Sequence, residues 1–177
     1  MSAMPCETPP AGPAAACAAG MQAMIPALET ARLRLRAPRV EDFPYYAEIT
    51  VGPRGVHVLD APSRESAWFD FTQMVAGWFL RGYGLWTVET RAEARVAGFV
   101  LLGFEPGDHE PELGYMFREW AEGKGLAAEA AKAARDFGFG ALGMTTLVST
   151  IDHGNTRSAA LAERLGATRD AAAEDAH

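Results

Sequence analysis

The sequence predicts an α/β protein whose helices flank one mixed, mostly antiparallel sheet. Three strand-like segments, 85–90, 96–104 and 110–118, follow one another with only short turns between them, which is typical of an antiparallel meander. Helix-like and strand-like segments then alternate toward the end of the chain, as they do when helices pack on a sheet. A length of 177 residues suits one domain with a substantial hydrophobic core.

The earlier part of the folded region also shows clear patterns. Residues 32–36 alternate arginine and leucine, which predicts a strand with one exposed face. Acidic residues early in 40–50 favour a short helix there. Ser63 is a good N-cap for a helix that runs to Arg81 and ends at Gly82. The aromatic stripe of this helix is either core or the wall of an acceptor groove (Trp68, Phe69, Phe71, Trp78 and Phe79).

The later part of the chain predicts two helices separated by a strand. A helix is expected over 125–140, a β-branched strand over 145–151, and a last helix over 155–165. Asn155 is a good N-cap for the last helix, and Ser158 follows it by three residues. In this order, the starts of the two helices are expected on the same side of the sheet.

The two ends of the chain differ in composition from its body. Residues 1–27 are rich in Ala, Pro and Gly without periodicity, so we expect a disordered extension, and Met21 or Met24 is an alternative start. The folded domain is expected over 28–169, followed by a short acidic tail over 170–177. A secretory signal peptide is not expected, because a basic start followed by a continuous apolar run is missing.

Composition and charge exclude several classes of function. The net charge of −7, without a Lys/Arg cluster, disfavours nucleic acid as the main partner and is compatible with a cationic substrate, such as an amine or a basic peptide end. No apolar run is long enough for a transmembrane helix, so no membrane partner is expected. Cys6 and Cys17 both precede the folded region, which fits a reducing cytoplasm. No histidine pair has metal-ligand spacing, and we expect no metal site.

The turn Gly123-Lys124-Gly125-Leu126-Ala127 is a candidate anion-binding site. It directly precedes an alanine-rich helix, whose first N–H groups lack intrahelical partners and lie at the positive end of the helix dipole. Because glycines keep side chains away from these groups, a phosphate or pyrophosphate can bind the backbone, and Lys124 adds a cation. Such a turn is also often a tight connection alone, and it matches neither the Walker loop nor the dinucleotide-binding fingerprint.

Four segments of the chain form a specific combination of motifs. They are L-E-T-A-R-L-R-L-R at 28–36, E-L-G-Y at 112–115, G-K-G-L-A-A-E-A at 123–130, and N-T-R-S at 155–158 followed by R-L-G-A at 164–167. In this order they resemble the motifs of GNAT-superfamily acetyltransferases, in particular the RimJ/RimL type of ribosomal-protein alanine N-acetyltransferases. The resemblance implies the acyl-CoA N-acyltransferase (GNAT) fold, with acetyl-CoA as co-substrate. It implies direct transfer of an acetyl group, in a ternary complex, to a primary amine of a small molecule or of a protein N-terminus.

The resemblance also implies roles for single residues. The backbone of the turn from Gly123 to Ala127 would bind the pyrophosphate of acetyl-CoA. The strand end would pair with the pantetheine arm (Tyr115, Met116 and Phe117). Asn155 and Ser158 would lie near the pantetheine and the thioester sulfur. Two tyrosines lie where this family often contacts the acceptor (Tyr45 and Tyr46).

Acyl transfer to an amine needs a base, and Glu112 is the candidate because it lies on the strand expected beside the thioester. Glu112 is alternatively a structural carboxylate. Two loop histidines are alternative bases (His109 and His153). Ser158 is the candidate general acid, or it only completes the helix cap. A backbone N–H near Tyr115 or Met116 is the candidate donor to the thioester carbonyl.

Two departures from the family pattern leave the activity open. Many members carry a tyrosine seven residues after the asparagine as general acid, and this chain has Ala162 there. The family normally continues with two strands after L-G-A, and here residues 167–169 are followed only by the tail. The last strands are then missing, cut off, or supplied by a partner such as a second copy in a homodimer. The alternative to an enzyme is a catalytically weak acyl-CoA-binding module.

Overall fold

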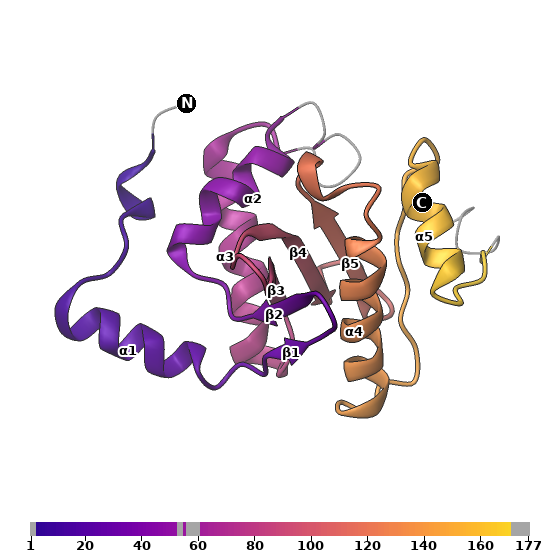
Figure 1. Cartoon of the computed structure of the whole chain (residues 1–177), viewed down its shortest axis with the longest axis horizontal. Helices are drawn as coiled ribbons and strands as arrows, with labels where there is room; N and C mark the ends of the chain where they lie inside the picture. The colour runs from indigo at the N-terminus through magenta and orange to yellow at the C-terminus, as the bar shows by residue number, and fades with distance from the viewer. Residues whose placement is uncertain (1–2, 53–54, 56–60, 171–177) are drawn as a thin grey trace.

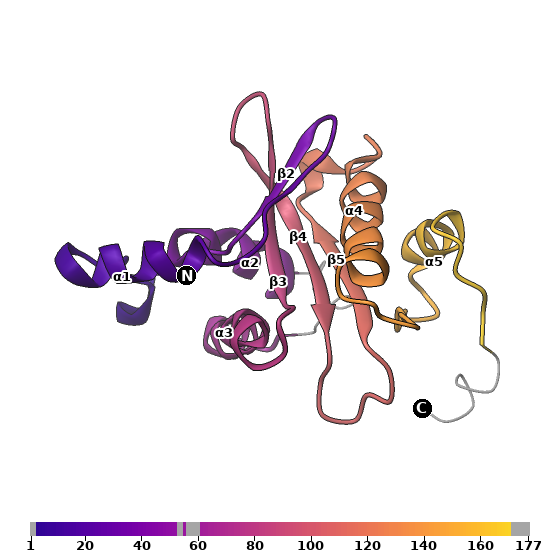
Figure 2. The same ribbon diagram turned by 90° about the horizontal axis from the view of Figure 1, so that it is seen from below.

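The computed structural model describes residues 3–52, 55 and 61–170 of the chain. Its elements follow in the order η1 (Pro5–Glu7), α1 (Gly12–Gln22), β1 (Leu28–Glu29), β2 (Leu33–Arg36), η2 (Val40–Asp42), α2 (Phe43–Thr50), α3 (Arg64–Arg81), β3 (Leu85–Thr90), β4 (Val96–Gly103), β5 (Glu112–Phe117), η4 (Glu119–Ala121), α4 (Leu126–Gly140) and α5 (Thr156–Arg164). Helices flank one sheet, which confirms the predicted fold class (Figure 1). In Figure 2, α2 and α3 lie on one side of the sheet and α4 and α5 on the other.

The sheet has five strands in the order β1-β2-β3-β4-β5, and each strand is antiparallel to its neighbours. The inner strand β4 is buried along its whole length, as expected where helices cover both faces. Gly98 of β4 lies opposite Phe117 of β5, and a Cβ added at Gly98 would come within 2.3 Å of the Met116 carbonyl oxygen. Glycine therefore allows β5 to lie close to β4 at this point. β5 itself forms an edge of the sheet.

Helices cover the two faces of the sheet with different side chains. On one face, α4 packs through small, fully buried residues, which let its backbone lie close to the strands (Ala130, Ala131 and Ala134). On the other face, α2 and α3 pack larger side chains against β3 and β4. The aromatic stripe of α3 is divided, because Phe71 and Trp78 are buried whereas Phe69 and Phe79 are exposed.

The ends of α3 follow the predicted local chemistry. The Ser63 hydroxyl accepts the N–H of Ser66 at 3.0 Å, and the Ser66 hydroxyl oxygen accepts the N–H of Ser63 at 3.0 Å. Two of the N–H groups at the start of the helix are thereby satisfied. Gly82 ends the helix in the left-handed region with φ 79°, which favours glycine.

The segment before the sheet is helical over Gly12–Gln22, which differs from the disorder expected for residues 1–27. Alanine, the strongest helix former, supplies much of this helix, although none of its residues is buried. Figure 1 shows α1 lying apart from the sheet. Glu7 connects the segment to α3 through two hydrogen bonds from Arg64, each of 2.6 Å. The division of the chain at 27 and 169 stays a prediction, and residues 171–177 of the expected tail lie outside the described residues.

The strand expected over 145–151 is wrong, because this segment makes only a single bridge to the sheet. Glu112 and Val148 form an isolated parallel bridge. The N–H of Leu113 donates to the Val148 carbonyl at 2.7 Å, and the N–H of Val148 donates to the Pro111 carbonyl at 2.9 Å. The β-branched composition thus gives an extended segment beside the start of β5 rather than a sixth strand.

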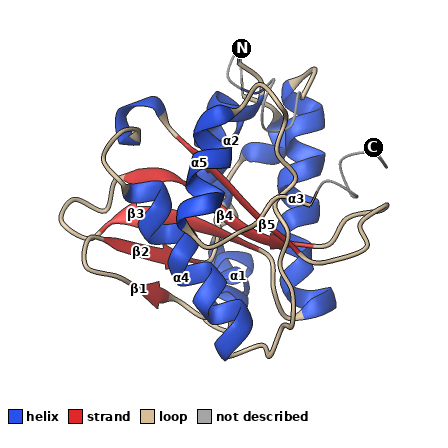
Figure 3. Ribbon diagram, turned by 90° about the vertical axis from the view of Figure 1, so that its right-hand side faces the viewer, coloured by secondary structure: helices blue, strands red, loops and turns tan. Residues whose placement is uncertain are grey.

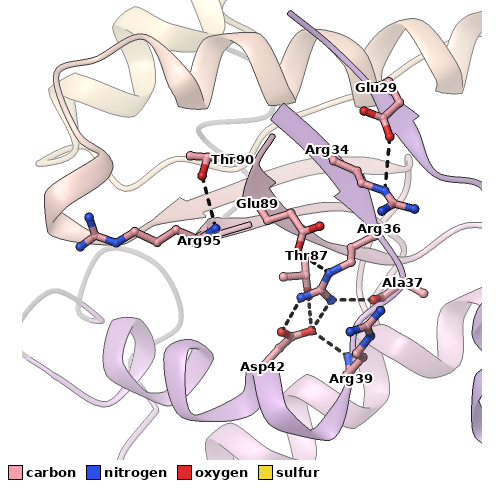
Figure 4. A network of polar contacts seen from close by, with 10 residues as sticks. All are labelled: Glu29, Arg34, Arg36, Ala37, Arg39, Asp42, Thr87, Glu89, Thr90 and Arg95. Atoms are coloured by element: carbon pink, nitrogen blue, oxygen red, sulfur yellow. Dashed lines mark hydrogen bonds and ion pairs between the residues drawn. The ribbon is translucent and has the colours of Figure 1, made fainter. Parts of the chain in front are cut away.

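A buried arginine holds β2, β3 and the start of α2 together (Figure 4). The Arg36 guanidinium donates to both carboxylate oxygens of Asp42, at 2.7 and 2.9 Å, and to Glu89 at 2.7 Å. Asp42 also accepts the Thr87 hydroxyl at 2.8 Å. Both carboxylates therefore have an arginine partner within the fold.

Within the part of the chain that the structure describes, no helix has the length and apolar character to cross a membrane.

Candidate active site

The free edge of β5 offers backbone groups for pairing with a ligand. Leu113 directs its N–H away from β4, toward Val148. Because successive residues of a strand direct their N–H and C=O groups to opposite sides, Tyr115 and Phe117 also direct theirs away from β4. The N–H of Met116 then belongs to the ladder with β4. Of the two donors considered from the sequence, Tyr115 rather than Met116 has its N–H at the free edge.

A cavity of about 120 Å³ opens beside this edge and brings together several of the residues expected at the site (Glu112, Tyr115, Met116, Asn155 and Ser158). Its opposite walls come from α2, α3 and the end of β4, and include Tyr46, Asp70 and Glu105. The Tyr115 hydroxyl donates to the carbonyl oxygen of Ser158 at 2.9 Å, which ties β5 to the start of α5. Burial raises the pKa of Tyr115 to about 12, so this hydroxyl stays protonated at neutral pH.

Glu112 begins β5 and reaches the cavity from the edge of the sheet. One of its carboxylate oxygens accepts the N–H of Thr150 at 3.1 Å. Burial raises the pKa of Glu112, the hydrogen bond from Thr150 lowers it, and the charge of Asp108 raises it again, so that the pKa lies above its usual range. A carboxylate with a raised pKa takes up a proton more readily near neutral pH, as a general base must.

Asn155 and Ser158 form the N-terminal cap of α5. The Asn155 side-chain oxygen accepts the backbone N–H of Ser158 at 3.1 Å. The cap thus uses the N–H of Ser158 and not its hydroxyl, and both residues line the cavity. A catalytic role of the Ser158 hydroxyl is therefore compatible with the place of this residue in the cap.

The turn before α4 has the backbone that an anion site needs. Gly123 and Gly125 have φ of 70° and 73°, in the left-handed region, and Gly125 caps the helix without a side-chain hydrogen bond. Two cations lie nearby on the Trp120 ring: the Lys124 ammonium at 5.2 Å and the Arg95 guanidinium at 3.9 Å from the ring centroid. Uncapped N–H groups at a positive helix end, beside two cations, fit the pyrophosphate of acetyl-CoA.

Arg32 forms hydrogen bonds both to this turn and to the helix that follows it. Its Nε donates to Glu129 at 2.6 Å, and its Nη1 donates to the Lys124 carbonyl oxygen at 2.9 Å. Glu129, in the first turns of α4, also accepts the Arg32 backbone N–H at 2.8 Å and the Thr30 hydroxyl at 2.6 Å. The motif at 28–36 and the motif at 123–130 therefore form one structural unit, which we call the Arg32–Glu129 latch.

The starts of α4 and α5 are connected directly. Arg157, in the first turn of α5, donates to Glu122 of the turn at 2.7 Å. Figure 3 shows the two helices on the same side of the sheet, as the order of motifs suggested. The turn from Gly123 to Ala127 does not itself line the cavity, and neither does Phe117, which is buried at the end of β5. The alternative bases His109 and His153 are not among the lining residues either.

Two further carboxylates line the cavity and were not predicted from the sequence. Asp70 comes from α3 and accepts the hydroxyl of Tyr46. Glu105 follows β4, and burial, together with the charges of Asp70, Glu112 and Asp108, raises its pKa. Neither residue belongs to a sequence motif. The two lie far apart in the sequence, and only the packing of α3 on the sheet brings them together. Among the described residues, no three His, Cys, Asp or Glu side chains are arranged to hold a metal ion.

Comparison with known proteins agrees with this architecture. The chain matches the model of the acetyltransferase (GNAT) domain over residues 32–168, and it belongs to this family. It is similar to the crystal structure of the acetyltransferase from Agrobacterium tumefaciens str. C58, with 38% identity and a TM-score of 0.79 over 82% of this chain and 85% of that chain. The GNAT resemblance seen in the motifs is thereby confirmed.

Two further proteins resemble this chain over a shorter stretch or at lower identity. The protein YkkB of Bacillus subtilis (strain 168), described as uncharacterized, is 36% identical over 92 residues, which are 49% of this chain. The match spans about half (52%) of the length of that relative. RimL, a ribosomal L7/L12 α-N-protein acetyltransferase solved in complex with coenzyme A, has a TM-score of 0.64 at 19% identity over 79% of this chain and 82% of its own. At this identity the likeness to RimL shows the fold alone.

Proposed function

We propose that this protein is an N-acetyltransferase that moves the acetyl group of acetyl-CoA to a primary amine by direct attack within a ternary complex. The observation that carries the proposal is the cavity beside β5, because it collects Glu112, Tyr115 and Ser158 at a free strand edge. The anion-binding turn before α4 lies beyond that edge and is joined to α5 by the Arg157–Glu122 ion pair. A long ligand with a pyrophosphate at one end fits this arrangement.

The pyrophosphate would be held by the backbone N–H groups from Lys124 to Ala127, and the pantetheine arm by the edge from Tyr115 to Phe117. Bound there, acetyl-CoA supplies an activated acetyl thioester. Asn155 fixes the start of α5, so that Ser158 lies at the cavity where the thioester sulfur would be.

The reaction needs three functions from the chain. Glu112 accepts one proton of the ammonium group, so that the neutral nitrogen bonds to the thioester carbonyl carbon. The backbone N–H of Tyr115 donates to the carbonyl oxygen as negative charge develops there. The Ser158 hydroxyl donates a proton to the sulfur as the carbon–sulfur bond breaks, and regains one from the nitrogen through solvent. An ammonium and a thioester thus give an N-acetyl amine, a free thiol and one proton.

Release of the free thiol from acetyl-CoA, measured with a panel of primary amines, tests the transfer. Glu112→Gln should lower turnover by about two orders of magnitude, the smaller end of what a general base contributes. The wild-type rate should also fall as the pH drops through the raised pKa of Glu112, and the variant should lose this dependence.

Glu110→Gln is the matched control, since Glu110 lies two residues earlier, is exposed and does not line the cavity. A Glu112→Gln variant with unchanged turnover at every pH would remove Glu112 as the base. Binding of coenzyme A without thiol release from any amine would favour the alternative of a weak acyl-CoA-binding module.

The proposal also covers the type of enzyme, its location, its oligomeric state and its acceptor. The motif order supports a RimJ/RimL type of enzyme, and the cysteine pattern supports a cytoplasmic location. A homodimer is part of the same proposal and is checked by light scattering during gel filtration. The acceptor is a small-molecule amine or a peptide N-terminus.

A further inference from the structure

A second cavity, of about 130 Å³, adjoins the first. Met74, Leu101 and Glu105 line both cavities, so the two are neighbours with Glu105 at their junction, and together we call them the groove. The first part lies at the candidate catalytic residues, and the second follows the C-terminal half of α3 away from them. The groove therefore has room for a ligand that extends beyond its reacting group.

The two parts of the groove differ in chemistry. The first part has three carboxylates in its walls (Asp70, Glu105 and Glu112). The second part is mostly apolar, with Leu80, Tyr83 and Phe104 among its lining residues. Besides Glu105, the second part has one charged lining residue among those described, Arg81. The Arg81 guanidinium lies 4.7 Å from the centroid of the Phe104 ring. One end of the groove thus attracts a cation, and the other accepts an apolar group and repels a second cation.

The carboxylates of the first part have no arginine partner among the described residues, unlike the buried carboxylates elsewhere in this protein. Outside the groove, four carboxylates whose side chains are largely buried pair with arginine. Asp42 and Glu89 pair with Arg36, Glu7 pairs with Arg64, and Glu129 pairs with Arg32. Within the described ranges, no lysine or arginine forms an ion pair with Asp70, Glu105 or Glu112, and no cation lowers their pKa. The described residues thus supply no opposite charge for these carboxylates, and a bound ammonium group would supply it.

We propose that the acceptor is a small primary amine with an apolar body, whose ammonium group lies among Asp70, Glu105 and Glu112 and whose body extends along α3 into the second cavity. This inference rests on the proposed function and names the substrate class of the same site. A polyamine fits less well, because its second ammonium group would lie beside Arg81. A peptide N-terminus fits less well, because its polar backbone would lie against the apolar walls.

Phenylethylamine, ethylamine, spermidine and a peptide with an N-terminal alanine are suitable acceptors for comparison. We expect kcat/KM for phenylethylamine to exceed that for each of the others by about tenfold or more, because only phenylethylamine buries an aromatic ring. Equal or better acetylation of spermidine or of the peptide would overturn the inference and leave the proposed function intact.

A pair of neighbouring substitutions tests the second cavity. Leu80→Asp and Phe79→Asp introduce the same charge at exposed positions of α3, but only Leu80 lines the cavity. Leu80→Asp should raise KM for phenylethylamine about tenfold without changing kcat, and KM for ethylamine should stay constant. Phe79→Asp should leave both values unchanged. The same KM shift in both variants, or in neither, would place the apolar body elsewhere.

Binding without turnover tests the inference independently of catalysis. Calorimetry in the presence of coenzyme A should show that phenylethylamine binds and that phenylethanol, which lacks the ammonium group, binds at least tenfold more weakly. Glu105→Gln should reduce this difference, whereas Glu110→Gln should not. Equal binding of the amine and the alcohol would overturn the inference. Binding of the amine with no thiol release would instead contradict the proposed function, and the two failures are thereby distinguished.

Discussion

The Arg32–Glu129 latch offers a direct test of how the pyrophosphate turn is held. Arg32→Met removes the ion pair to Glu129 and the hydrogen bond to the Lys124 carbonyl, and keeps the length of the apolar stem. Glu129 still accepts the Thr30 hydroxyl and a backbone N–H, so its carboxylate is not left without partners. The substitution therefore tests the turn without leaving an unsatisfied buried charge.

The expected magnitude can be worked out from these contacts. The Arg32 side chain is 52% exposed, so the ion pair contributes about 0.5–1 kcal/mol after screening by solvent. The hydrogen bond to Lys124 adds about 0.5–1 kcal/mol, and we expect the free energy of unfolding to fall by about 1–2 kcal/mol in total. A loosened turn must be ordered again when coenzyme A binds, at about 1–2 kcal/mol for one residue, which raises Kd about tenfold.

Arg34→Met is a matched control on the same strand. The Arg34 side chain is 50% exposed and pairs with Glu29, which is 51% exposed, at 3.3 Å, so its loss should cost less than about 1 kcal/mol. Urea unfolding gives the stability of each variant, and titration calorimetry gives Kd for coenzyme A. If Arg32→Met and Arg34→Met weakened coenzyme A binding equally, or if neither weakened it, the latch would not position the turn.

Three further perturbations test the packing and the charges of the fold. Arg36→Met should lower the free energy of unfolding by about 3–5 kcal/mol in urea titrations, because it leaves buried carboxylates unpaired. Gly98→Ala should cost about 1–3 kcal/mol, because the new Cβ meets the Met116 carbonyl oxygen at 2.3 Å; an unchanged unfolding midpoint would contradict this contact. Burial and neighbouring carboxylates raise the pKa of Glu105, so its ionised form destabilises the fold at a pH above its unfolded pKa of about 4.3. Glu105→Gln should therefore raise Tm at pH 7 and have little effect near pH 4.

Local chemistry explains which elements the sequence predicts well. The serine pair at the start of α3 and Gly82 at its end act within a few residues, so their effect is visible in the sequence. The strand expected over 145–151 fails because strand formation depends on a distant partner. Among the described residues its one backbone bridge to the sheet is at Val148, and the β-branched side chains around it do not supply the missing pairing.

In the segment before the sheet, the structure has the helix α1 where the sequence suggested disorder. Prolines, glycines and the lack of an apolar stripe suggested disorder, and the absence of buried residues in α1 agrees with that weak tertiary signal. The alanines of Gly12–Gln22 nevertheless form a helix, with Pro13 in its first turn, where proline is tolerated. Intrinsic propensity decides the local conformation here, where tertiary packing contributes little.

The residues of the candidate site also fall into two groups, those that the sequence predicted and those that only the packing brings together. Glu112, Asn155 and Ser158 were predicted because each lies in a motif at a fixed distance from a turn or helix start, and the structure places them around one cavity. Their catalytic roles stay predictions. Asp70 and Glu105 could not be predicted, because they come from α3 and from the segment after β4. Only the packing of α3 on the sheet brings these two carboxylates to the same groove.

The groove differs from the rest of the protein in that its carboxylates are not paired with arginine among the described residues. A fold that pairs its buried carboxylates with arginine could have done the same at Asp70 and Glu105, and would have gained stability by it. An arginine in the groove, however, would neutralise the attraction for an ammonium group and would lower the pKa of Glu112, making it a weaker base. Uncompensated carboxylates thus destabilise the free protein and favour the binding and deprotonation of an amine. The same electrostatic property accounts for the expected stabilisation by Glu105→Gln and for the expected loss of selectivity toward the amine in that variant.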